Sequence, residues 1–311
     1  MPSSAGRETK PERRSTEQRV TEHRNPASRN LDRFSTEQIL QLMSREDRTV
    51  AVAVQRELRA IVKAADAILA ALRSGGRLFY VGAGSSGRMA VLDAAEIAPT
   101  FGTSPELVQA LIAGGRQAVT SAVEGAEDAV RNGKRDLRAR RFSSKDIIVG
   151  IAASGTTPYV LGALKYARAQ GATIIALTSN KRMPITQLAD IVIAPEVGPE
   201  VVTGSTRLKA GTSQKLVLNM LSTTAMVRLG HVYENLMIDA VLTNQKLEER
   251  ALRILAEASG KSVSDGRRAL RLAEHDIRVA LVMLKRGASA PAARKLLERA
   301  GGNLRAALGE A

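Results

Sequence analysis

Residues 78–88 read Leu-Phe-Tyr-Val-Gly-Ala-Gly-Ser-Ser-Gly-Arg. Four apolar residues in succession are typical of a strand that is buried on both faces, as strands of parallel sheets are. The glycines after them allow a tight turn, and a helical stretch follows. A strand, a glycine turn and a helix in this order predict one unit of a doubly wound α/β fold.

Four more short apolar runs follow along the chain, and helical stretches fit between most of them. The runs lie at residues 107–112, 147–151, 174–178 and 191–193. Their β-rich, nearly continuous apolar character indicates buried strands. We therefore expect a parallel sheet with helices on both faces, whose ligands bind outside the carboxyl ends of the strands.

The two ends of the chain differ from this pattern. Residues 1–20 are polar and lack periodicity, which predicts a disordered tail. A capping box that begins at Ser35 predicts the first helix, and apolar residues at helical spacing over residues 50–72 predict one long helix. Glycine and proline break residues 246–311 into short helical pieces, which predict a small helical domain after a main domain at residues 21–245.

The charge balance raises the question of an anionic partner. Lys and Arg number 46 against 31 Asp and Glu, so the formal net charge is +15. The basic residues are spread along the chain, with one dense run at residues 131–141. Aromatic residues make up 3% of the chain, without Trp, so platforms for base stacking are scarce. We expect an anionic small molecule and no nucleic acid.

Cysteine is absent, which excludes disulfides, zinc–thiolate sites and thiol nucleophiles. The three histidines, His23, His231 and His275, do not have the spacing of metal ligands, so we expect no metal. No apolar run approaches the length of a membrane span, and the N-terminal region lacks the apolar core of a signal peptide. These features predict a cytoplasmic protein without a membrane partner.

Hydroxyl groups occupy the first glycine turn. Residues 82–88 match the G-x-G-x-x-G pattern of dinucleotide sites. The next strand, however, ends in Ala-Gly-Gly at residues 113–115, where such a site needs an acidic residue for the ribose. The Ser85 and Ser86 hydroxyls at a helix N-terminus suit a phosphate instead. A tight turn with incidental serines is the alternative.

A second loop of the same kind follows the run at residues 147–151. Residues 152–158 read Ala-Ala-Ser-Gly-Thr-Thr-Pro and supply the hydroxyls of Ser154 and Thr156. Thr157 and Pro158 by themselves could be only an N-cap and a first-turn proline. Together the two loops predict a site for a small sugar phosphate.

Carboxylates near these loops are candidates for acid and base. Asp93 and Glu96 stand three apart on the predicted helix after the first loop, which places them on one face. Glu124 comes first among the acidic residues that open the helix after residues 113–115, where negative charge is favoured by the helix dipole. Each glutamate is either a solvated surface residue or a catalytic group.

Five stretches of the chain, in this order, resemble the N-acetylmuramic acid 6-phosphate etherases, which are members of the sugar isomerase (SIS) domain superfamily. The stretches are residues 81–88, 92–102, 122–128, 150–155 and 200–212. The last one, Glu-Val-Val-Thr-Gly-Ser-Thr-Arg-Leu-Lys-Ala-Gly-Thr, is the most specific. The resemblance extends over residues 21–308.

The resemblance implies a three-layer α/β/α SIS domain, a UBA-like helical domain at the C-terminus, a homodimer and no cofactor. It implies hydrolytic cleavage of the D-lactyl ether of N-acetylmuramic acid 6-phosphate to N-acetylglucosamine 6-phosphate and D-lactate. Glu96 and Glu124 fall on the catalytic glutamates of the family. The residues that fall on its sugar-phosphate contacts are Ser85, Ser86, Ser154 and Thr156. Thr156 stands where many relatives have Arg.

Two carboxylates are sufficient for this reaction. Beside an open-chain aldehyde the C2 proton is acidic enough for a carboxylate to remove, and lactate leaves C3 if its oxygen is protonated. We assign Glu124 as the base and Glu96 as the acid. A sugar-phosphate-sensing regulator and an aldose–ketose phosphate isomerase on the same domain are the alternatives. Residues 1–34 are too short and polar for the helix-turn-helix of a transcription factor.

Overall fold

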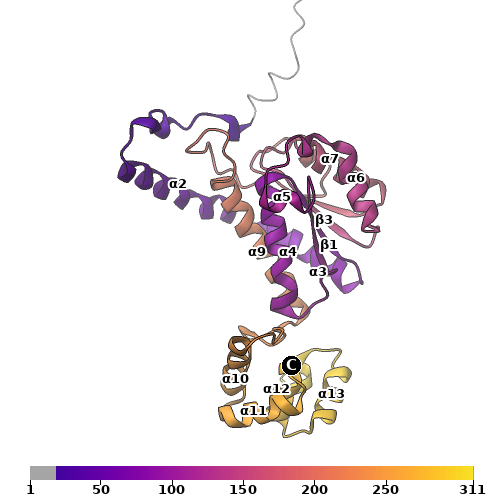
Figure 1. Ribbon diagram of the computed structural model, residues 1–311. Coiled ribbons are helices and arrows are strands. Elements are labelled where there is room, and N and C mark those ends of the chain that lie inside the picture. Colours follow the sequence, from indigo (N-terminus) through magenta and orange to yellow (C-terminus); the bar gives the residue numbers. More distant parts are fainter. Residues whose placement is uncertain (1–18, 311) are drawn as a thin grey trace, which may run out of the picture.

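The computed structural model describes residues 19–310, and a five-stranded parallel sheet lies at its centre (Figure 1). The strand order is β2-β1-β3-β4-β5. The strands are β1 (Leu78–Gly82), β2 (Val108–Ile112), β3 (Ile147–Ile151), β4 (Thr173–Leu177) and β5 (Ile191–Ile193). All five predicted strands are confirmed to within one residue, because runs that are buried on both faces give the clearest strand signal.

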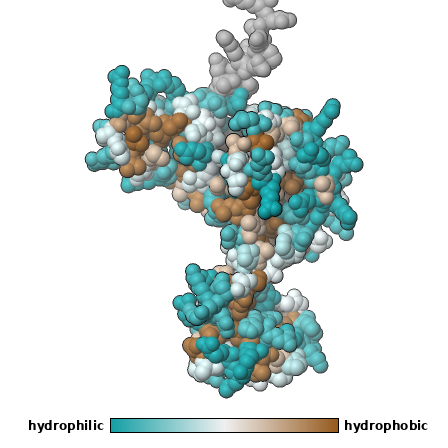
Figure 2. Space-filling view, viewed as in Figure 1, coloured by the Kyte–Doolittle hydropathy of each residue, from teal (hydrophilic) through white to brown (hydrophobic). Residues whose placement is uncertain are grey.

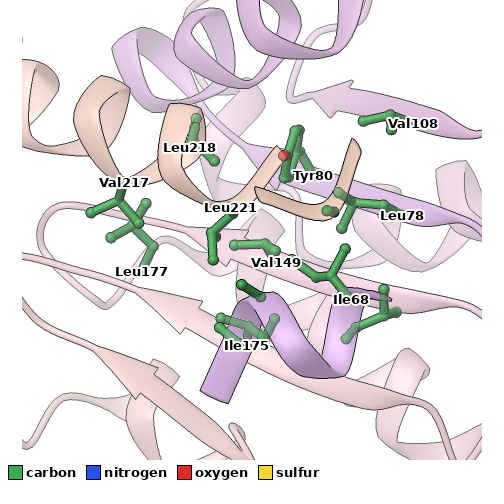
Figure 3. Packing of buried hydrophobic residues seen from close by; sticks show 14 of the residues in the cluster. Ile68, Leu78, Tyr80, Val108, Val149, Ile175, Leu177, Val217, Leu218 and Leu221 are labelled. Carbon is green, nitrogen blue, oxygen red and sulfur yellow. The ribbon is translucent and has the colours of Figure 1, made fainter. Parts of the chain in front are cut away.

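Helices cover both faces of the sheet. Leu78 and Tyr80 of β1 point to one face, and Phe79 and Val81 point to the other. The first face is covered by α3 (Leu58–Arg73), α4 (Gly84–Phe101) and α9 (Lys209–Leu229). The second face is covered by α6 (Val130–Ala139), α7 (Pro158–Ala169) and α8 (Pro184–Gln187). Figure 3 shows the core of the first face, where Ile68 and Leu221 pack against the strands. The predicted three-layer fold is confirmed.

Ordered structure begins before the predicted first helix. Three short 3₁₀ turns precede it, namely η1 (Val20–Glu22), η2 (Pro26–Ser28) and η3 (Leu31–Arg33). The predicted capping box is confirmed, since the Ser35 hydroxyl accepts from the Gln38 N–H at 3.2 Å and the Gln38 side chain accepts from the Ser35 N–H at 2.8 Å. Most of the predicted tail, residues 1–18, lies outside the described residues.

The prediction of one long helix over residues 50–72 is wrong. Helix α2 (Thr36–Arg56) ends at Glu57, which has φ −94° and ψ 4°, and α3 begins directly after it. The Glu57 carboxylate accepts a hydrogen bond from the N–H of Ala194, just after β5, at 3.2 Å. The apolar periodicity continues across this break because Val54 of α2 and Ile61 of α3 enter the same core. Helix α2 extends away from the sheet as an arm, and hydrophobic side chains gather on its surface (Figures 1 and 2).

The C-terminal helices form a body with its own core, which is joined to the sheet domain near the ends of α4 and α9 (Figure 1). A two-stranded hairpin of β6 (Val232–Tyr233) and β7 (Leu236–Met237) precedes the helices. The helices are α10 (Gln245–Ser259), α11 (Val263–Leu272), α12 (Ile277–Arg286), α13 (Ala290–Arg299) and α14 (Leu304–Leu308). No helix within residues 19–310 is long and apolar enough to cross a membrane.

Candidate active site

The loops after β1 and β3 leave the sheet side by side. Gly82 at the end of β1 pairs with Ile151 at the end of β3. Because β2 lies on one side of this pair and β4 on the other, the chain connections diverge here. A crevice opens at such a switch point in a parallel sheet. The structure therefore brings the two predicted hydroxyl-rich loops to one place.

Close packing explains the glycines of the first loop. A Cβ on Gly82 would lie 2.7 Å from the nitrogen of Gly87, and a Cβ on Gly87 would lie 2.5 Å from a side chain of β2. The residue before α4 is Ala83, and no side chain caps the first turn of the helix. Ser85 is half-buried and Ser86 is buried in that turn. This turn therefore offers N–H groups and hydroxyls to an anion.

The second loop is held in one conformation by the strand beside it. The Asn180 side-chain amide, after β4, donates to the carbonyl oxygen of Ala153 at 2.7 Å. Gly155 has φ +73°, which glycine adopts without strain. The Ser154 hydroxyl oxygen accepts from the N–H and the hydroxyl of Thr156, at 3.3 and 3.1 Å. The two predicted hydroxyls thus lie together at the mouth of the loop.

Glu124 does not open a helix, so the predicted position is wrong. The chain first forms α5 (Gln117–Thr120) and the 3₁₀ turn η4 (Ala126–Asp128), and Glu124 lies exposed in the loop between them. Acidic residues near a helix start are compatible with both arrangements, so sequence spacing could not separate the loop from the helix.

Arg88 places the Glu124 loop beside the first turn of α4. Its guanidinium donates to the carbonyl oxygens of Val119 and Ser121, both at 3.1 Å. Glu124, Arg88 and Gly84 line one cavity of about 180 Å³. Arg88 stands in the glycine motif, but no sequence pattern indicates this positioning contact, because the partners of Arg88 are backbone atoms. Glu124 and the first loop are therefore neighbours.

Glu96 lies far from this cavity within the same chain. It follows Gly84 by twelve residues on α4, which corresponds to about 18 Å along the helix. Its side chain is exposed, whereas Asp93 is buried with 4% exposure. Asp93 and Glu96 stand three residues apart on α4, as predicted, but their surroundings differ, because α4 turns Asp93 toward the core and leaves Glu96 exposed to solvent.

Comparisons with known proteins identify the domain and the family of the chain. A model of the SIS domain matches residues 129–224, and a model of the N-terminal SIS domain of glucokinase regulatory protein matches residues 60–168. An N-acetylmuramic acid 6-phosphate etherase of Photorhabdus laumondii is 52% identical over 286 residues, which cover 92% of this chain and 95% of that protein. N-acetylmuramic acid 6-phosphate etherase 1 of Bacillus licheniformis is 50% identical over 289 residues, which cover 93% of this chain and 95% of that protein.

The chain belongs to the N-acetylmuramic acid 6-phosphate etherase family. A solved phosphoheptose isomerase of Neisseria gonorrhoeae is 21% identical, with a TM-score of 0.48 over 61% of this chain and 97% of that one.

In this etherase-family chain, the stretch at residues 200–212 builds the start of α9. Glu200 is fully buried, and its carboxylate accepts from the N–H groups of Lys209 at 3.1 Å and Ala210 at 2.9 Å. Burial raises the pKa of Glu200, and these two hydrogen bonds oppose the rise. The Lys209 ammonium lies 2.6 Å from Glu46 of α2. The stretch therefore fixes α2, α9 and the loop after β5 together, a role that only long-range contacts reveal.

Asp93 is a buried carboxylate that joins three elements of the etherase-family fold. Asp93 accepts hydrogen bonds from the Tyr80 hydroxyl at 3.1 Å and the Ser222 hydroxyl at 3.3 Å, and the Lys215 ammonium lies 3.9 Å away. Burial raises the pKa of Asp93, and its hydrogen bonds and Lys215 only partly offset this. Asp93 thereby links α4 to β1 and α9. Within residues 19–310, no group of three or more His, Cys, Asp or Glu side chains could hold a metal ion.

Proposed function

We propose that this etherase-family chain cleaves the D-lactyl ether of N-acetylmuramic acid 6-phosphate with water, giving N-acetylglucosamine 6-phosphate and D-lactate. Identity of 50–52% with etherases over more than nine-tenths of the chain carries the proposal. A sugar-phosphate sensor and an aldose–ketose isomerase are not favoured by these relatives. Release of D-lactate from this substrate by the purified protein tests it. Turnover of the sugar without lactate would support the isomerase instead.

The phosphate is held at the crevice between β1 and β3. The first turn of α4 supplies N–H groups and the partial positive charge of a helix N-terminus, and Ser85 and Ser86 add hydroxyls. In the second loop, where their hydroxyl oxygens lie 3.1 Å apart, Ser154 and Thr156 contact the phosphate and the sugar hydroxyls. Thr156 can donate one hydrogen bond where an arginine would add a charge. A cytoplasmic location is part of the proposal and is compatible with a chain that lacks cysteine.

The reaction is an elimination followed by a hydration. Glu124 removes the C2 proton of the open-chain sugar, and the electron pair forms the C2–C3 double bond as the C3–O bond breaks. Glu96 donates its proton to the departing lactate oxygen. Glu96, now ionised, takes a proton from water as the hydroxyl adds to C3, and Glu124 returns the proton to C2. No redox partner is needed.

The two glutamates of one site come from two chains of a homodimer. Glu96 lies about 18 Å along α4 from the phosphate loop of its own chain, so it cannot reach a substrate bound there. If two α4 helices pack antiparallel about a two-fold axis near Leu92, Glu96 of the partner subunit comes level with Arg88. Arg88 lies about one turn from the phosphate loop and holds the Glu124 segment.

Exposed apolar side chains support such a pairing. Leu92 on α4 is 44% exposed, and Val227 on the neighbouring α9 is also 44% exposed. On the α2 arm, Leu40 is 60% exposed. Burying these side chains against a second copy is favourable by about 25 cal/mol per Å² of apolar surface. An interface of this kind is isologous, so each copy gives its Glu96 and receives one.

Complementation between inactive variants tests the composite site. Co-expression of Glu96→Gln and Glu124→Gln chains with different affinity tags yields a heterodimer with one intact site and one doubly damaged site. We expect this heterodimer to release lactate at about half the wild-type rate per dimer, whereas each homodimer is inactive. A heterodimer as inactive as its parents would place both glutamates of a site in one chain.

A further inference from the structure

The Glu96-bearing end of α4 is fixed by the segment that leads to the helical domain. The N–H of Val241 donates to the carbonyl oxygen of Pro99 at 3.2 Å. Gly102 ends α4 with φ +61°, and a Cβ there would lie 2.6 Å from the carbonyl oxygen of Asp239. The segment therefore lies directly against the last turn of α4, which begins within one turn of Glu96.

One arginine joins this segment to the helical domain. Arg278, on α12, donates two hydrogen bonds to the carboxylate of Asp239. It also donates to the carbonyl oxygen of Gly302, between α13 and α14, at 2.9 Å and to that of Gly230, at the end of α9, at 3.1 Å. A planar guanidinium that binds both oxygens of a carboxylate fixes direction as well as distance.

The Arg278–Asp239 contact is largely withdrawn from solvent. The Arg278 side chain is 19% exposed and that of Asp239 is 13% exposed. Nδ1 of the His231 imidazole lies 2.6 Å from the same carboxylate. The His231 ring also packs edge-on against Phe101 of α4, with the ring centroids 6.2 Å apart. Shielding of this kind makes an ion pair stronger and more rigid than a surface pair.

We propose that Arg278 is a positioning residue for Glu96. Through Asp239 it makes the Glu96-bearing end of α4 and the helical domain one rigid body, and this body reaches the active site of the partner subunit. The inference rests on the composite site proposed above. It also places the helical domain of one chain nearer the active site of the partner subunit than its own. The reason is that this domain stands at the Glu96 end of α4, away from the phosphate loop of its own chain (Figure 1).

The consequence of losing Arg278 depends on which chain has lost it. A catalytic group misplaced by about 1 Å can cost roughly 100-fold in rate. The site that receives Glu96 from the altered chain should therefore be slow. The site in which the altered chain supplies only Glu124 should be unaffected, because the segment before Glu124 is held by Arg88 at the other end of α4, through the carbonyl oxygens of Val119 and Ser121.

Two heterodimers separate positioning from general damage. In the first, Arg278→Met is placed in the Glu124→Gln chain, which supplies Glu96 to the one intact site. In the second, it is placed in the Glu96→Gln chain, which supplies Glu124. We expect kcat of the first to fall roughly 10- to 100-fold below that of the heterodimer without the change, with a smaller effect on KM. The second should keep its kcat within about twofold.

Each other result would overturn the proposal. Equal losses in both heterodimers would show a purely structural role, and no loss in either would show no role. If the heterodimer without Arg278→Met is already inactive, the composite site itself is wrong, and the present inference is wrong with it.

Two further variants guard against misfolding. Arg278→Lys keeps the charge but not the two-pronged contact, and it should show the same chain dependence with a smaller loss. Arg268→Met removes an exposed ion pair with Asp265 from α11 of the same domain and should change neither heterodimer. Chain-dependent loss with Arg268→Met would overturn the specific role of Arg278.

Discussion

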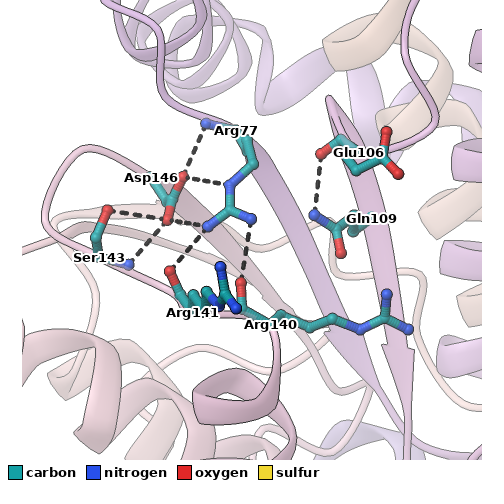
Figure 4. Close-up of polar contacts among 7 residues, drawn as sticks. All are labelled: Arg77, Glu106, Gln109, Arg140, Arg141, Ser143 and Asp146. Atoms are coloured by element: carbon teal, nitrogen blue, oxygen red, sulfur yellow. Dashed lines mark hydrogen bonds and ion pairs between the residues drawn. The ribbon is translucent and has the colours of Figure 1, made fainter.

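Arg77 and Asp146 form a two-pronged ion pair across the amino ends of β1 and β3, with Nη2 2.9 Å from Oδ2 and Nε 3.0 Å from Oδ1 (Figure 4). The same guanidinium donates to the carbonyl oxygens of Arg140 and Arg141, at 3.1 and 3.0 Å. The pair therefore closes the turn between α6 and β3 at the edge of the sheet opposite the candidate site. Two residues of the basic run at residues 131–141 therefore contact this ion pair through their carbonyl oxygens and not through their charges.

Replacing Arg77 by Ala should lower the free energy of unfolding by roughly 3 kcal/mol, because it leaves a buried carboxylate without its partner. Denaturant unfolding measures this. Arg135→Ala is the matched control, since its ion pair with Asp136 is exposed and should contribute less than about 0.5 kcal/mol. Equal effects of the two changes would contradict the special role of Arg77.

Stability should also depend on pH through Asp146. Burial by itself raises the pKa of this carboxyl, but hydrogen bonds from Arg77 and Ser143 and the charge of Arg77 together hold it below its usual value. A lowered pKa in the folded state gives stability that is present above the unfolded pKa of about 3.9 and is lost as pH falls further. Asp146→Asn should remove this acid-dependent loss in unfolding measured from pH 6 to pH 2. If the free energy of unfolding of the variant falls with pH as steeply as that of the wild type, Asp146 is not the group responsible.

Ser86→Ala should raise KM for the phosphorylated substrate, because it removes a hydrogen bond to a charged group, at a cost of roughly 1.5–3 kcal/mol. Steady-state kinetics measure the change, and unphosphorylated N-acetylmuramic acid should be a poor substrate of the wild-type chain. Ser144→Ala is the control, since Ser144 is exposed at the amino end of the sheet. Comparable kcat/KM with and without the phosphate would rule out this phosphate site.

Hydrogen exchange at C2 distinguishes the two glutamates. Glu96→Gln should lose lactate release by roughly 10²–10⁴-fold yet still exchange the C2 proton with deuterated solvent, and Glu124→Gln should lose both. Mass spectrometry of the recovered sugar measures the exchange. Glu127→Gln, in the exposed turn beside Glu124, is the control. The reverse pattern would show that Glu96 is the base and Glu124 is the acid.

Asp93→Asn should stabilise the protein at neutral pH. Because burial raises the pKa of Asp93 in the folded state, the stability present below its unfolded pKa of about 3.9 is lost as pH rises through the folded value. Asn does not ionise, so the variant avoids this loss. Its free energy of unfolding should exceed that of the wild type by on the order of 1.4 kcal/mol for each unit by which the pKa is raised. Unfolding at pH 4 and pH 8 measures it, with exposed Asp66→Asn as control. A variant that is less stable at pH 8 than wild type would show that Lys215 and the hydroxyl partners outweigh burial.

Local patterns were sufficient for the strands and for the places where they end. The run at residues 147–151 is apolar throughout because both of its faces are buried, so it could form only an inner strand. Gly82 is needed because a Cβ there would meet the backbone of Gly87, five residues along the chain, which is why the turn after the first strand was predictable. Likewise the capping box at Ser35 depends on two side chains three residues apart. The close approach of Gly87 to Ile112 of β2 is a long-range contact.

Distances between residues far apart in the sequence depend on how the elements pack. The sequence motifs that resemble the etherase family include both Glu96 and Glu124. The length of α4, however, separates Glu96 from the phosphate loop of its own chain. At the break between α2 and α3, the Glu57 carboxylate accepts a hydrogen bond from the N–H of Ala194, and helical periodicity carries no record of that contact. Periodicity reports which side of an element is apolar, whereas the packing of one element on another determines what each polar side chain meets.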